Sequence, residues 1–264
     1  MPIGPTELVE KVALANRILG SLDLTHEALG HVSCRIEGSD AMLIKGKGPG
    51  EAGLRYTDTR DVIKVDFNAD KLEGPDDLQP PSESYLHIWM YKTRPEVQSV
   101  VHVHPEHAVL LTICDKPILP IFGAFASGAR LAMQGIPVYP RSITIHDDQL
   151  GQDFAATMGS NPVCLMRGHG ITTVGNCVEQ STLHAIHLEQ LCTMMYKAYL
   201  LGDPKPIPDQ DFQETAGRLG ASGRSRGSAG GVEGMMATWR YYVRLTEERF
   251  ARREPVESTA ALRE

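Results

Sequence analysis

The chain has 264 residues, a net charge of −7 at pH 7 and 42% hydrophobic residues, which is enough apolar material for one large domain or at most two. Its 26 basic residues form no dense patch in the first 200 positions, which argues against nucleic acid as the main partner. No apolar stretch is uninterrupted for long enough to predict a membrane span, and the start lacks a secretory pattern, so we expect a cytoplasmic protein with no membrane partner.

The first quarter of the chain predicts one helix and two strands. Apolar side chains recur at helical spacing over residues 5–20, which predicts a helix. Short β-branched runs at 41–46 and 61–66 predict strands. The segment 70–81 is rich in Pro, Gly and Asp and predicts a turn-rich connection. The motif "GHVS" at 30–33 is expected to lie in a loop.

A second helix is expected over residues 84–93. Ser82 is interpreted as its N-cap, and Glu83 as an acidic residue of the first turn, where the helix dipole favours negative charge. His87 lies four positions after Glu83 and therefore on the same helical face.

Three histidines occur within the apolar stretch "VVHVHPEHAV" at 100–109. The valines predict a β-strand, and residues two apart on a strand point to one face, so His102 and His104 lean into one small volume. Two such imidazoles can bind one cation together. A pair of core histidines is an equally open interpretation of this motif alone.

The elements that follow complete a layered pattern. A short helix is expected near 105–113 and a strand at 136–140. Residues 161–175 predict a strand, a turn and a second strand, and 177–201 predicts a long helix. Strands that alternate with helices predict a layered α/β domain.

The composition changes after residue 202, so we divide the chain into a catalytic domain at 1–202 and a second segment at 203–264. The stretch 203–234 is rich in Gly, Ser and Arg and predicts a flexible segment, for which a lid, a disordered loop and a subunit contact all remain open. A last helix over 235–253 is expected to dock back, completing the same domain or forming a subunit contact.

Five cysteines are scattered along the chain, at positions 34, 114, 164, 177 and 192. Their number is odd and no C-x-x-C pair occurs. The simplest interpretation is a reduced cytosolic protein with buried thiols.

A further histidine, His169, lies between Gly168 and Gly170 in the predicted turn at 161–175. The glycines permit tight dihedrals and a close approach of the backbone to whatever His169 contacts. Three neutral imidazoles with the Glu83 carboxylate form a suitable ligand set for Zn²⁺, Mn²⁺ or a similar ion. A set without cysteine fits a catalytic site better than a structural zinc site.

Four segments together resemble the class II aldolase/adducin family. They are "GHVSCR" (30–35), "PPSES" at the start of 80–104, the HxH strand that ends that range, and "MRGHGITTVG" (166–175). The resemblance runs from about residue 5 to residue 200, and it is the joint order of the motifs that is specific. It implies a three-layer α/β/α fold with a mixed, mostly antiparallel sheet, and a homo-oligomer, usually a C4 tetramer with active sites between subunits.

Carried over residue by residue, the resemblance places the metal ligands of the family on His102, His104 and His169. The acid/base glutamate, which in some members is also a ligand, falls on Glu83. Adducin-like members that have lost the metal are non-catalytic. Because this chain keeps the whole set, we expect an enzyme with a divalent metal cofactor.

The sequence departs from the sugar-phosphate aldolases on the substrate side. His31 stands where those members have asparagine, and Lys45 and Lys47 lie in "KGKG" where they have Thr-Gly. Pro81-Ser82 replaces Ser-Ser, and "LPIFGAFASGARL" contains no tyrosine to protonate an aldol leaving group. In this interpretation the metal site of the family is kept, but it acts on a substrate other than a sugar phosphate.

Cationic or imidazole replacements suit a substrate with carboxylates, with Lys47, Arg35, Ser82 and Lys45 as the substrate-binding candidates. Further basic candidates are the arginines at 130, 224 and 226. Phe122 and Phe125 are candidates to flank an aromatic ring. The pattern is most similar to the family's metal-dependent branch that decarboxylates hydroxylated aromatic dicarboxylates, such as 3,4-dihydroxyphthalate and 3-hydroxypyridine dicarboxylates, in aromatic catabolism.

The expected activity is therefore a carbon–carbon lyase reaction, in which the metal stabilises phenolate charge while carbon dioxide leaves. Glu83 is the expected proton donor to the ring carbon, with His31 second. A metal-dependent aldolase acting on a hydroxy-keto acid or a sugar, and a non-catalytic adducin-like scaffold, remain as alternatives.

Overall fold

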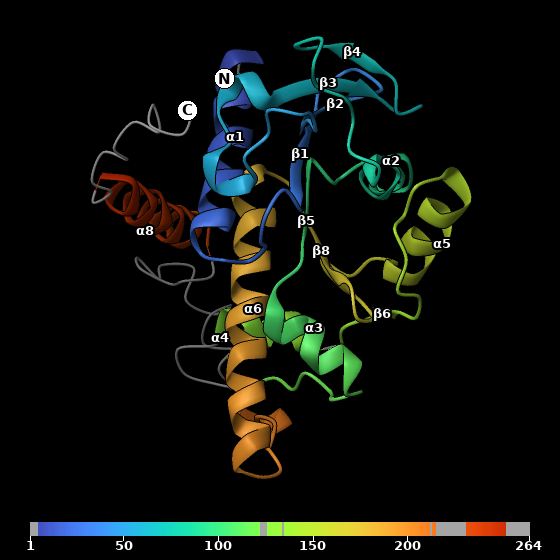
Figure 1. The fold of residues 1–264 in the computed structure, drawn as a ribbon. Helices are drawn as coiled ribbons and strands as arrows, with labels where there is room; N and C mark the ends of the chain where they lie inside the picture. The colour runs from blue at the N-terminus through green and yellow to red at the C-terminus, as the bar shows by residue number, and fades with distance from the viewer. Residues whose placement is uncertain (1–4, 122–125, 134, 212, 215–230, 252–264) are drawn as a thin grey trace, which may run out of the picture.

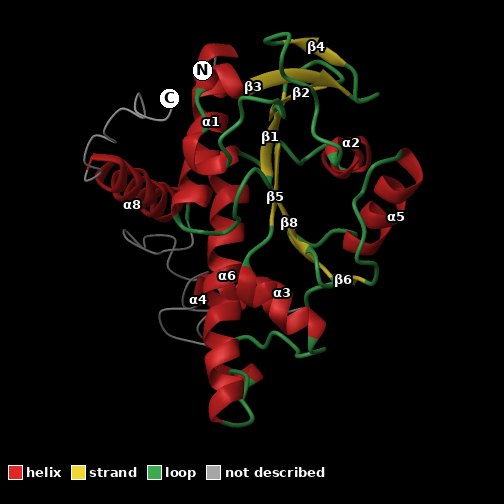
Figure 2. Ribbon diagram, in the orientation of Figure 1, coloured by secondary structure: helices red, strands yellow, loops and turns green. Residues whose placement is uncertain are grey.

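A mixed β-sheet of eight strands runs through the centre of the computed structural model, with helices on both faces (Figures 1 and 2). The structure describes residues 5–121, 126–133, 135–211, 213–214 and 231–251. From one edge of the sheet to the other, the strands are β4 (Lys71–Glu73), β3 (Val62–Asp66), β2 (Ala41–Lys45), β1 (His31–Arg35), β5 (Ser99–Val103), β8 (Gly170–Gly175), β7 (Val163–Met166) and β6 (Val138–Tyr139). Neighbouring strands are antiparallel, except that β6 and β7 are parallel.

Helices form a layer on each face of this sheet (Figure 1). One layer holds α1 (Pro5–Ser21), α3 (Glu106–Ile113), α4 (Ala126–Ala132), α6 (Val178–Leu201) and α8 (Val232–Ala251). The opposite layer holds α2 (Ser84–Thr93) and α5 (Asp148–Met158). Two 3-10 helices, Leu54–Tyr56 and Thr59–Asp61, lie between β2 and β3. The expected three-layer α/β/α fold with a mixed, mostly antiparallel sheet is confirmed.

Each face of the sheet has its own apolar core, and the alternation of side chains along β5 separates the two. Val101 and Val103 belong to the core that includes α1 and α6, whereas Val100 belongs to the core that includes α2 and α5. Because strand residues alternate between faces, His102 lies on the α2 side. His31 is paired with His102 across β1 and β5 and lies on that side as well.

Most predicted elements are present, but the "GHVS" motif does not lie in a loop. His31 begins β1, a strand at the centre of the sheet whose first four residues are all buried. Residues 31–35 do alternate between polar and apolar, but only Val32 has a high strand propensity and the polar positions are buried as well, so the strand signal is weak. The helix α5 was likewise not predicted, and β4 lies inside the segment expected to be a connection.

The interpretation of Ser82 as a helix cap is wrong. The helix α2 begins at Ser84, and its N-cap is Glu83, whose side chain makes no capping bond. The Ser84 hydroxyl instead donates to the carbonyl of Pro81 at 2.7 Å, and Ser82 is exposed. The Glu83 side chain is thus left available for contacts outside the helix.

The last helix, α8, packs against α1 and α6. Trp239 and Tyr242 are buried there, and the Gln190 amide donates to the Tyr242 hydroxyl at 2.8 Å. Ser21 and Thr246 share a hydroxyl bond of 3.0 Å between α1 and α8. These contacts tie the C-terminal helix to the same body as the sheet, while the boundary expected at residue 202 stays a prediction.

Much of the Gly/Ser/Arg-rich stretch expected at 203–234, including the arginines at 224 and 226, lies outside the described residues. Phe122 and Phe125 also lie outside them. Within the described ranges, no helix combines the length and the apolar content that crossing a lipid bilayer requires.

Candidate metal centre

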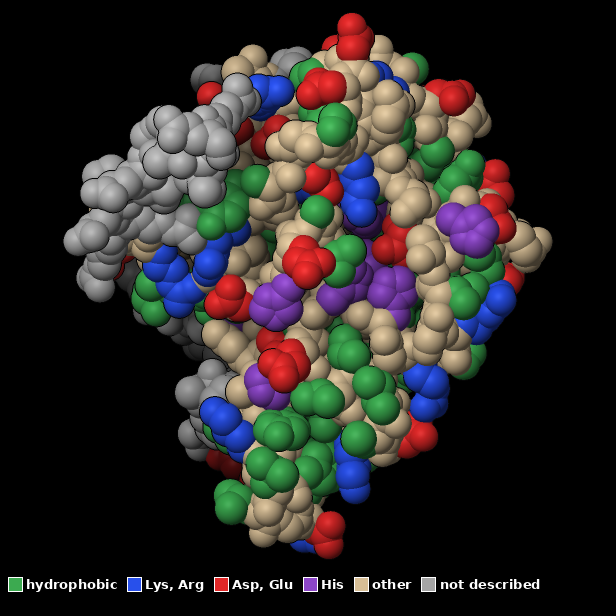
Figure 3. Space-filling model, viewed as in Figure 1, with side chains coloured by type: hydrophobic (Ala, Val, Ile, Leu, Met, Phe, Trp, Pro, Cys, Tyr) green, Lys and Arg blue, Asp and Glu red, His purple; other side chains and the backbone are tan. Residues whose placement is uncertain are grey.

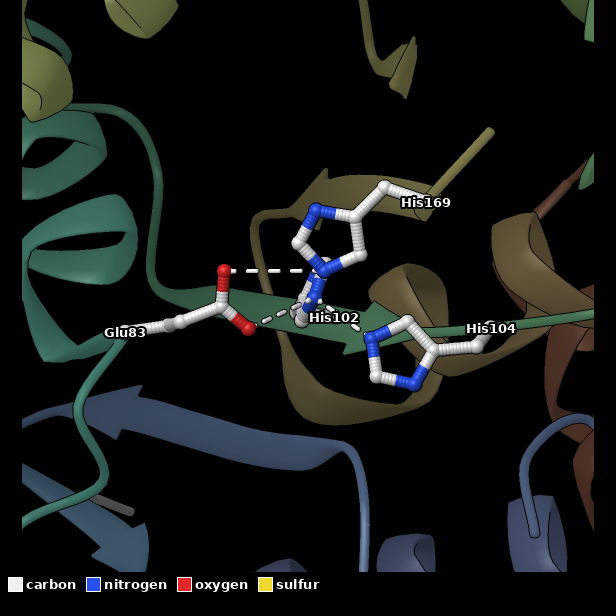
Figure 4. A group of neighbouring side chains, drawn as sticks. All are labelled: Glu83, His102, His104 and His169. Atoms are coloured by element: carbon white, nitrogen blue, oxygen red, sulfur yellow. Dashed lines mark hydrogen bonds and ion pairs between the residues drawn. The ribbon is translucent and has the colours of Figure 1, made fainter. Parts of the chain in front are cut away.

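Glu83, His102, His104 and His169 converge at one end of the sheet, on the side of α2 (Figure 4). One ligand atom from each residue lies within 4.8 Å of all the others. The Nε2 atoms of His102 and His104 are 3.0 Å apart. The two carboxylate oxygens of Glu83 lie 3.2 Å from His102 Nε2 and 3.6 Å from His169 Nε2. The structure therefore brings together the metal ligands and the glutamate predicted from the sequence.

The backbone explains how three separate segments meet. Glu83 precedes α2, His102 lies in β5 with His104 just beyond it, and His169 lies in the β7–β8 turn. Gly168 in that turn has a φ of +61°, in the left-handed region that favours glycine. A Cβ at Gly170 would lie 2.5 Å from the carbonyl oxygen of Val103 and 2.7 Å from the His104 ring. Only glycine allows the turn to approach β5 this closely.

The Nδ1 atom of each of the three imidazoles is held by a hydrogen bond. This orientation turns the Nε2 atom toward the centre of the cluster. For His102, His104 and His169 the partners of Nδ1 are Ile171 O at 3.1 Å, Thr25 Oγ1 at 3.3 Å and Ile143 O at 3.1 Å. A carbonyl oxygen only accepts, so Nδ1 of His102 and of His169 carries a proton, and whenever the ring is neutral its lone pair lies on Nε2. This is the arrangement that orients metal-ligating histidines.

The donor set fits a divalent metal ion. His102 Nε2 and His104 Nε2 are 3.0 Å apart, a contact that is satisfied by a proton or a cation between the two nitrogens. In a tetrahedral zinc site with Zn–N bonds of about 2.0–2.1 Å, ligand nitrogens are about 3.3 Å apart, close to this spacing. Three imidazoles and one carboxylate are typical of metal sites that leave a coordination position for substrate.

Charge at the centre is strongly coupled. Burial works to raise the pKa of the Glu83 carboxyl, but the charge on His102 and hydrogen bonds from His102 and His169 hold it well below its ordinary value. The backbone N–H of Ile145 also donates to Glu83 Oε1 at 3.1 Å. Burial, with the charges on His102 and His169, lowers the pKa of His104 to about 3. Glu83 is therefore a carboxylate in the resting protein.

Burial opposes the charged form of His169, but its hydrogen bond and attraction to Glu83 outweigh this and raise its pKa. His169 is half-buried, in keeping with a position at the mouth of the site. Figure 3 shows histidine side chains that reach the surface near the middle of this face, among basic and acidic side chains.

His31 lies behind the ligands rather than in a loop over them. Its ring centroid is 5.4 Å from that of His102, and only 3% of the residue is exposed. Its Nδ1 is 2.7 Å from His87 Nε2. Burial and the nearby charges on His87 and His102 keep the pKa of His31 well below its ordinary value, so the ring is neutral.

The two lysines of "KGKG" have different surroundings. Lys45 is buried, and its Nζ lies 2.6 Å from Glu51 Oε2, so its charge is already neutralised. Lys47 is half-buried, and its charge lowers the pKa of His104, which places it near the ligands. Among the described residues, Lys47 has no ion pair. It is the lysine available to an anionic ligand.

Arg35 ends β1, while His31 begins it, a separation of about 13 Å along the strand. Its guanidinium donates to the carbonyl oxygens of Tyr91 and Val97 and lies over the Tyr91 ring. The structure thus places Arg35 away from the cluster. The Arg130 side chain is exposed on α4.

No pattern in the sequence indicates the groups that bind the Nδ1 atoms of the candidate ligands or the Glu83 carboxylate. Thr25 lies in the connection between α1 and β1, and Ile143 and Ile145 contribute only backbone atoms. Every residue type supplies a backbone carbonyl, so the identity of a residue does not reveal that its backbone binds a side chain of the site. The four-residue spacing between Glu83 and His87 was the one sequence pattern that indicated a buried polar side chain, His87, near the site.

Comparison with known proteins identifies the family. Residues 10–196 match the family described as "Class II Aldolase and Adducin N-terminal domain". The chain is 38% identical over 212 residues to the 3,4-dihydroxyphthalate decarboxylase of Arthrobacter keyseri, covering 78% of this chain and 84% of the relative. It is 39% identical over 205 residues to the protein of the same name from Terrabacter sp. strain DBF63, covering 76% and 85%.

More distant relatives include the L-fuculose phosphate aldolase of Haemophilus influenzae, 28% identical over 201 residues, with 76% of this chain and 88% of the relative covered. The solved L-fuculose 1-phosphate aldolase of Glaciozyma antarctica has a TM-score of 0.75 at 18% identity, covering 92% of this chain and 90% of that one. An aldolase II superfamily protein of Pseudomonas syringae has a TM-score of 0.76 at 21% identity, covering 94% and 96%. The chain belongs to the class II aldolase/adducin family.

Proposed function

We propose that the protein is a metal-dependent decarboxylase of an ortho-hydroxy aromatic dicarboxylate, with 3,4-dihydroxyphthalate or a hydroxypyridine dicarboxylate as substrate. The observation that carries the proposal is the convergence of three imidazole nitrogens on the Glu83 carboxylate at one end of the sheet. Relatives named 3,4-dihydroxyphthalate decarboxylase, 35–39% identical over most of the chain, support this substrate class.

His102, His104 and His169 would hold the metal ion, with Glu83 beside it. When bound, a divalent cation supplies a Lewis acid that stabilises negative charge on the substrate oxygen. Neutral imidazoles with one carboxylate suit both Zn²⁺ and Mn²⁺, and we propose one of these as the native ion.

Glu83 moves the proton that the reaction needs. As a resting carboxylate it takes the proton of the substrate hydroxyl, which leaves a phenolate. It then returns this proton to the ring carbon that bears the leaving carboxylate. When the carbon–carbon bond breaks, carbon dioxide leaves without the bonding electrons, which return to the ring and restore the phenolate. The proton gained by the ring is the one lost by the hydroxyl, so no external acid is needed until the product phenolate is protonated.

Lys47 is the proposed partner of a substrate carboxylate, because it is a half-buried cation near His104. We do not extend this role to Lys45, whose charge is paired with Glu51, or to Arg35, whose guanidinium serves two backbone carbonyls. Ser82 is exposed immediately before Glu83 and stays a candidate for a hydroxyl contact with substrate.

A metal-dependent aldolase is the alternative, favoured by the 28% identity to an L-fuculose phosphate aldolase and by the same ligand set. A non-catalytic scaffold is disfavoured because all the ligands are present and oriented. The two enzyme functions are separated by incubating the metal-loaded protein with 3,4-dihydroxyphthalate and with fuculose 1-phosphate. Carbon dioxide from the first supports the decarboxylase, and an aldehyde from the second alone supports the aldolase.

We further propose that the protein is a cytoplasmic homotetramer. All five cysteines are free, and burial raises the pKa of Cys34 and of Cys164 to about 12, as suits unreactive thiols in a reducing compartment. Sedimentation analysis of the purified protein tests the tetramer.

A further inference from the structure

A row of buried polar side chains leads from α2 along the sheet to the metal centre. Tyr91 Oη lies 2.6 Å from Ser33 Oγ, and Ser33 Oγ lies 2.7 Å from His87 Nδ1. His87 Nε2 lies 2.7 Å from His31 Nδ1. His31 in turn is paired across the sheet with the ligand His102. We call Tyr91, Ser33, His87 and His31 the polar chain.

The polar chain is sealed from solvent over nearly all its length. Ser33 and His87 are 0% exposed, Tyr91 2% and His31 3%. Buried polar groups are costly unless they are hydrogen-bonded, so each link must place its hydrogen correctly. The hydrogen bonds of such a chain can be donated in one of two orders, from Tyr91 toward His31 or from His31 toward Tyr91.

Tyr91, at the end of the polar chain farthest from the metal centre, determines which of the two orders holds. Tyr91 is only 2% exposed, so the hydrogen of its hydroxyl needs an acceptor inside the protein. Ser33 Oγ is the one hydrogen-bond partner of Tyr91 Oη among the described residues, so Tyr91 donates to Ser33. Ser33 then donates to His87 Nδ1, and His87 donates from Nε2 to His31 Nδ1. In the opposite direction, Tyr91 would be left with a buried hydrogen and no partner.

His31 therefore carries its proton on Nε2, on the side of the ring away from His87. Among the described residues, Tyr139 Oη is the one sealed side-chain polar atom that lacks a partner. His31 Nε2 also has no hydrogen-bond partner among the described residues. It is not one of the fully buried unpaired atoms, so it keeps some access to solvent. The His31 ring is tilted by 33° to the His102 ring and lies within the field of the Glu83 carboxylate. The free N–H thus belongs to a ring whose centroid is 5.4 Å from that of His102.

We propose that the polar chain fixes His31 as the neutral Nε2–H tautomer, and that His31 donates this N–H to a carboxylate or phenolate oxygen of the substrate. The identity of that oxygen rests on the proposed function. Ser33, His87 and Tyr91 act as positioning residues through His31. A neutral donor contacts an anionic oxygen without adding charge beside the metal ligands, and a hydrogen bond to a charged acceptor is among the stronger ones.

This role differs from proton donation. If His31 released its Nε2 proton, the deficit would pass along the chain to Tyr91. Burial raises the pKa of Tyr91 well above its ordinary value, so that end cannot supply the proton. His31 thus orients and binds, while Glu83 moves the proton.

The tautomer is measured directly by ¹⁵N NMR of the imidazoles in the zinc-loaded, unmodified protein. The expected spectrum shows a protonated Nε2 and a bare Nδ1 for His31, assigned by comparison with His31→Gln. In Ser33→Ala the donor to His87 is lost, and the His31 signal is expected to move toward the Nδ1–H form. Finding Nδ1–H with a bare Nε2 in the unmodified protein overturns the proposal without any variant.

The substrate contact is tested by binding of phthalate, which has two carboxylates but no hydroxyl to initiate turnover. Its Kd for the zinc-loaded protein is expected to rise roughly tenfold or more in Ser33→Ala. Ser99→Ala is the matched control: Ser99 is also 0% exposed and lies on the adjacent strand, but its hydroxyl donates to the Ser33 carbonyl, outside the polar chain. Its Kd is expected to stay within about twofold of the unmodified protein.

Equal loss in both serine variants would reduce the effect to general packing and overturn the contact, as would the absence of phthalate binding to the unmodified protein. If Ser33→Ala does not fold, Tyr91→Phe removes the terminal hydroxyl alone and is expected to mix the two His31 tautomers. Neither readout depends on turnover. If both hold while no carbon dioxide is released from 3,4-dihydroxyphthalate, the proposed function fails and the assignment of His31 stands.

Discussion

His102 Nε2 and His104 Nε2 lie 3.0 Å apart, although His102 is a residue of β5 and His104 lies just beyond the end of that strand. The contact is held from behind, because His102 Nδ1 is bound to a β8 carbonyl and His104 Nδ1 to the hydroxyl of Thr25. Two imidazoles held this way cannot turn apart. Their front nitrogens are therefore preorganised for one cation.

The first prediction is that the purified protein binds about one divalent ion per chain, which is lost in His102→Ala and in His169→Ala. The fold is expected to survive, because the core on each face of the sheet is unaffected. Elemental analysis with circular dichroism measures both. His26→Ala, which changes an exposed histidine outside the cluster, is expected to keep its metal. Stoichiometric metal in His102→Ala/His104→Ala would eliminate the proposed site.

The second prediction concerns the proton carrier. Glu83→Gln keeps the shape and the bond from the Ile145 amide but cannot accept the hydroxyl proton, so turnover is expected to fall roughly 10²-fold or more with substrate affinity retained. Steady-state kinetics and the phthalate Kd separate the two effects. Glu106→Gln, an exposed change on α3, serves as the control. Turnover near that of the unmodified enzyme would exclude the role of Glu83.

The third prediction separates the two neighbouring lysines. Lys47→Met is expected to weaken phthalate binding roughly tenfold with little change in stability, because its charge has no ion pair among the described residues. Lys45→Met is expected to destabilise the protein by about 3–5 kcal/mol, because it leaves the Glu51 carboxylate largely buried and unpaired. Chemical denaturation and calorimetric binding measure the two quantities. If the effects of the two variants are interchanged, the assignment of these lysines is wrong.

The fourth prediction tests the close approach of the β7–β8 turn. Gly170→Ala places a methyl group 2.5 Å from the Val103 carbonyl oxygen and 2.7 Å from the His104 ring, so the turn must move away. We expect a loss of about 1–3 kcal/mol in stability together with weaker metal binding. Gly50→Ala, where a Cβ meets nothing within 4 Å, should change neither. Unaltered metal affinity in Gly170→Ala would show that the turn does not position His169.

The residues that converge in the candidate metal centre could be picked out from the sequence because their signals are local. A β-strand with alternate histidines and a histidine between glycines each mark a few consecutive residues, and the order of the motifs indicated the family, which the comparisons confirm. The position of His31 was not predictable. Its strand is short and contains one β-branched residue, Val32, and its polar side chains face the interior, which the polar–apolar alternation of the sequence does not indicate.

The groups that hold the side chains of the site in place could not be predicted from the sequence, for a different reason. Ile143 and Ile145 contribute a carbonyl and an amide that any residue would provide. The pairing of Lys45 with Glu51, six positions apart, depends on the path of the loop between them and not on a regular spacing. Such contacts arise from tertiary approach, which composition and periodicity do not encode.

The central claim is that the metal centre removes a carboxylate because an adjacent hydroxyl can collect the charge. The most direct measurement compares carbon dioxide release from 3,4-dihydroxyphthalate and from 4-hydroxyphthalate, which lacks only the hydroxyl next to the carboxylate that leaves. With zinc- or manganese-loaded protein, we predict release from the first and none above background from the second. Equal release from both, or reaction of a sugar phosphate alone, would contradict the account.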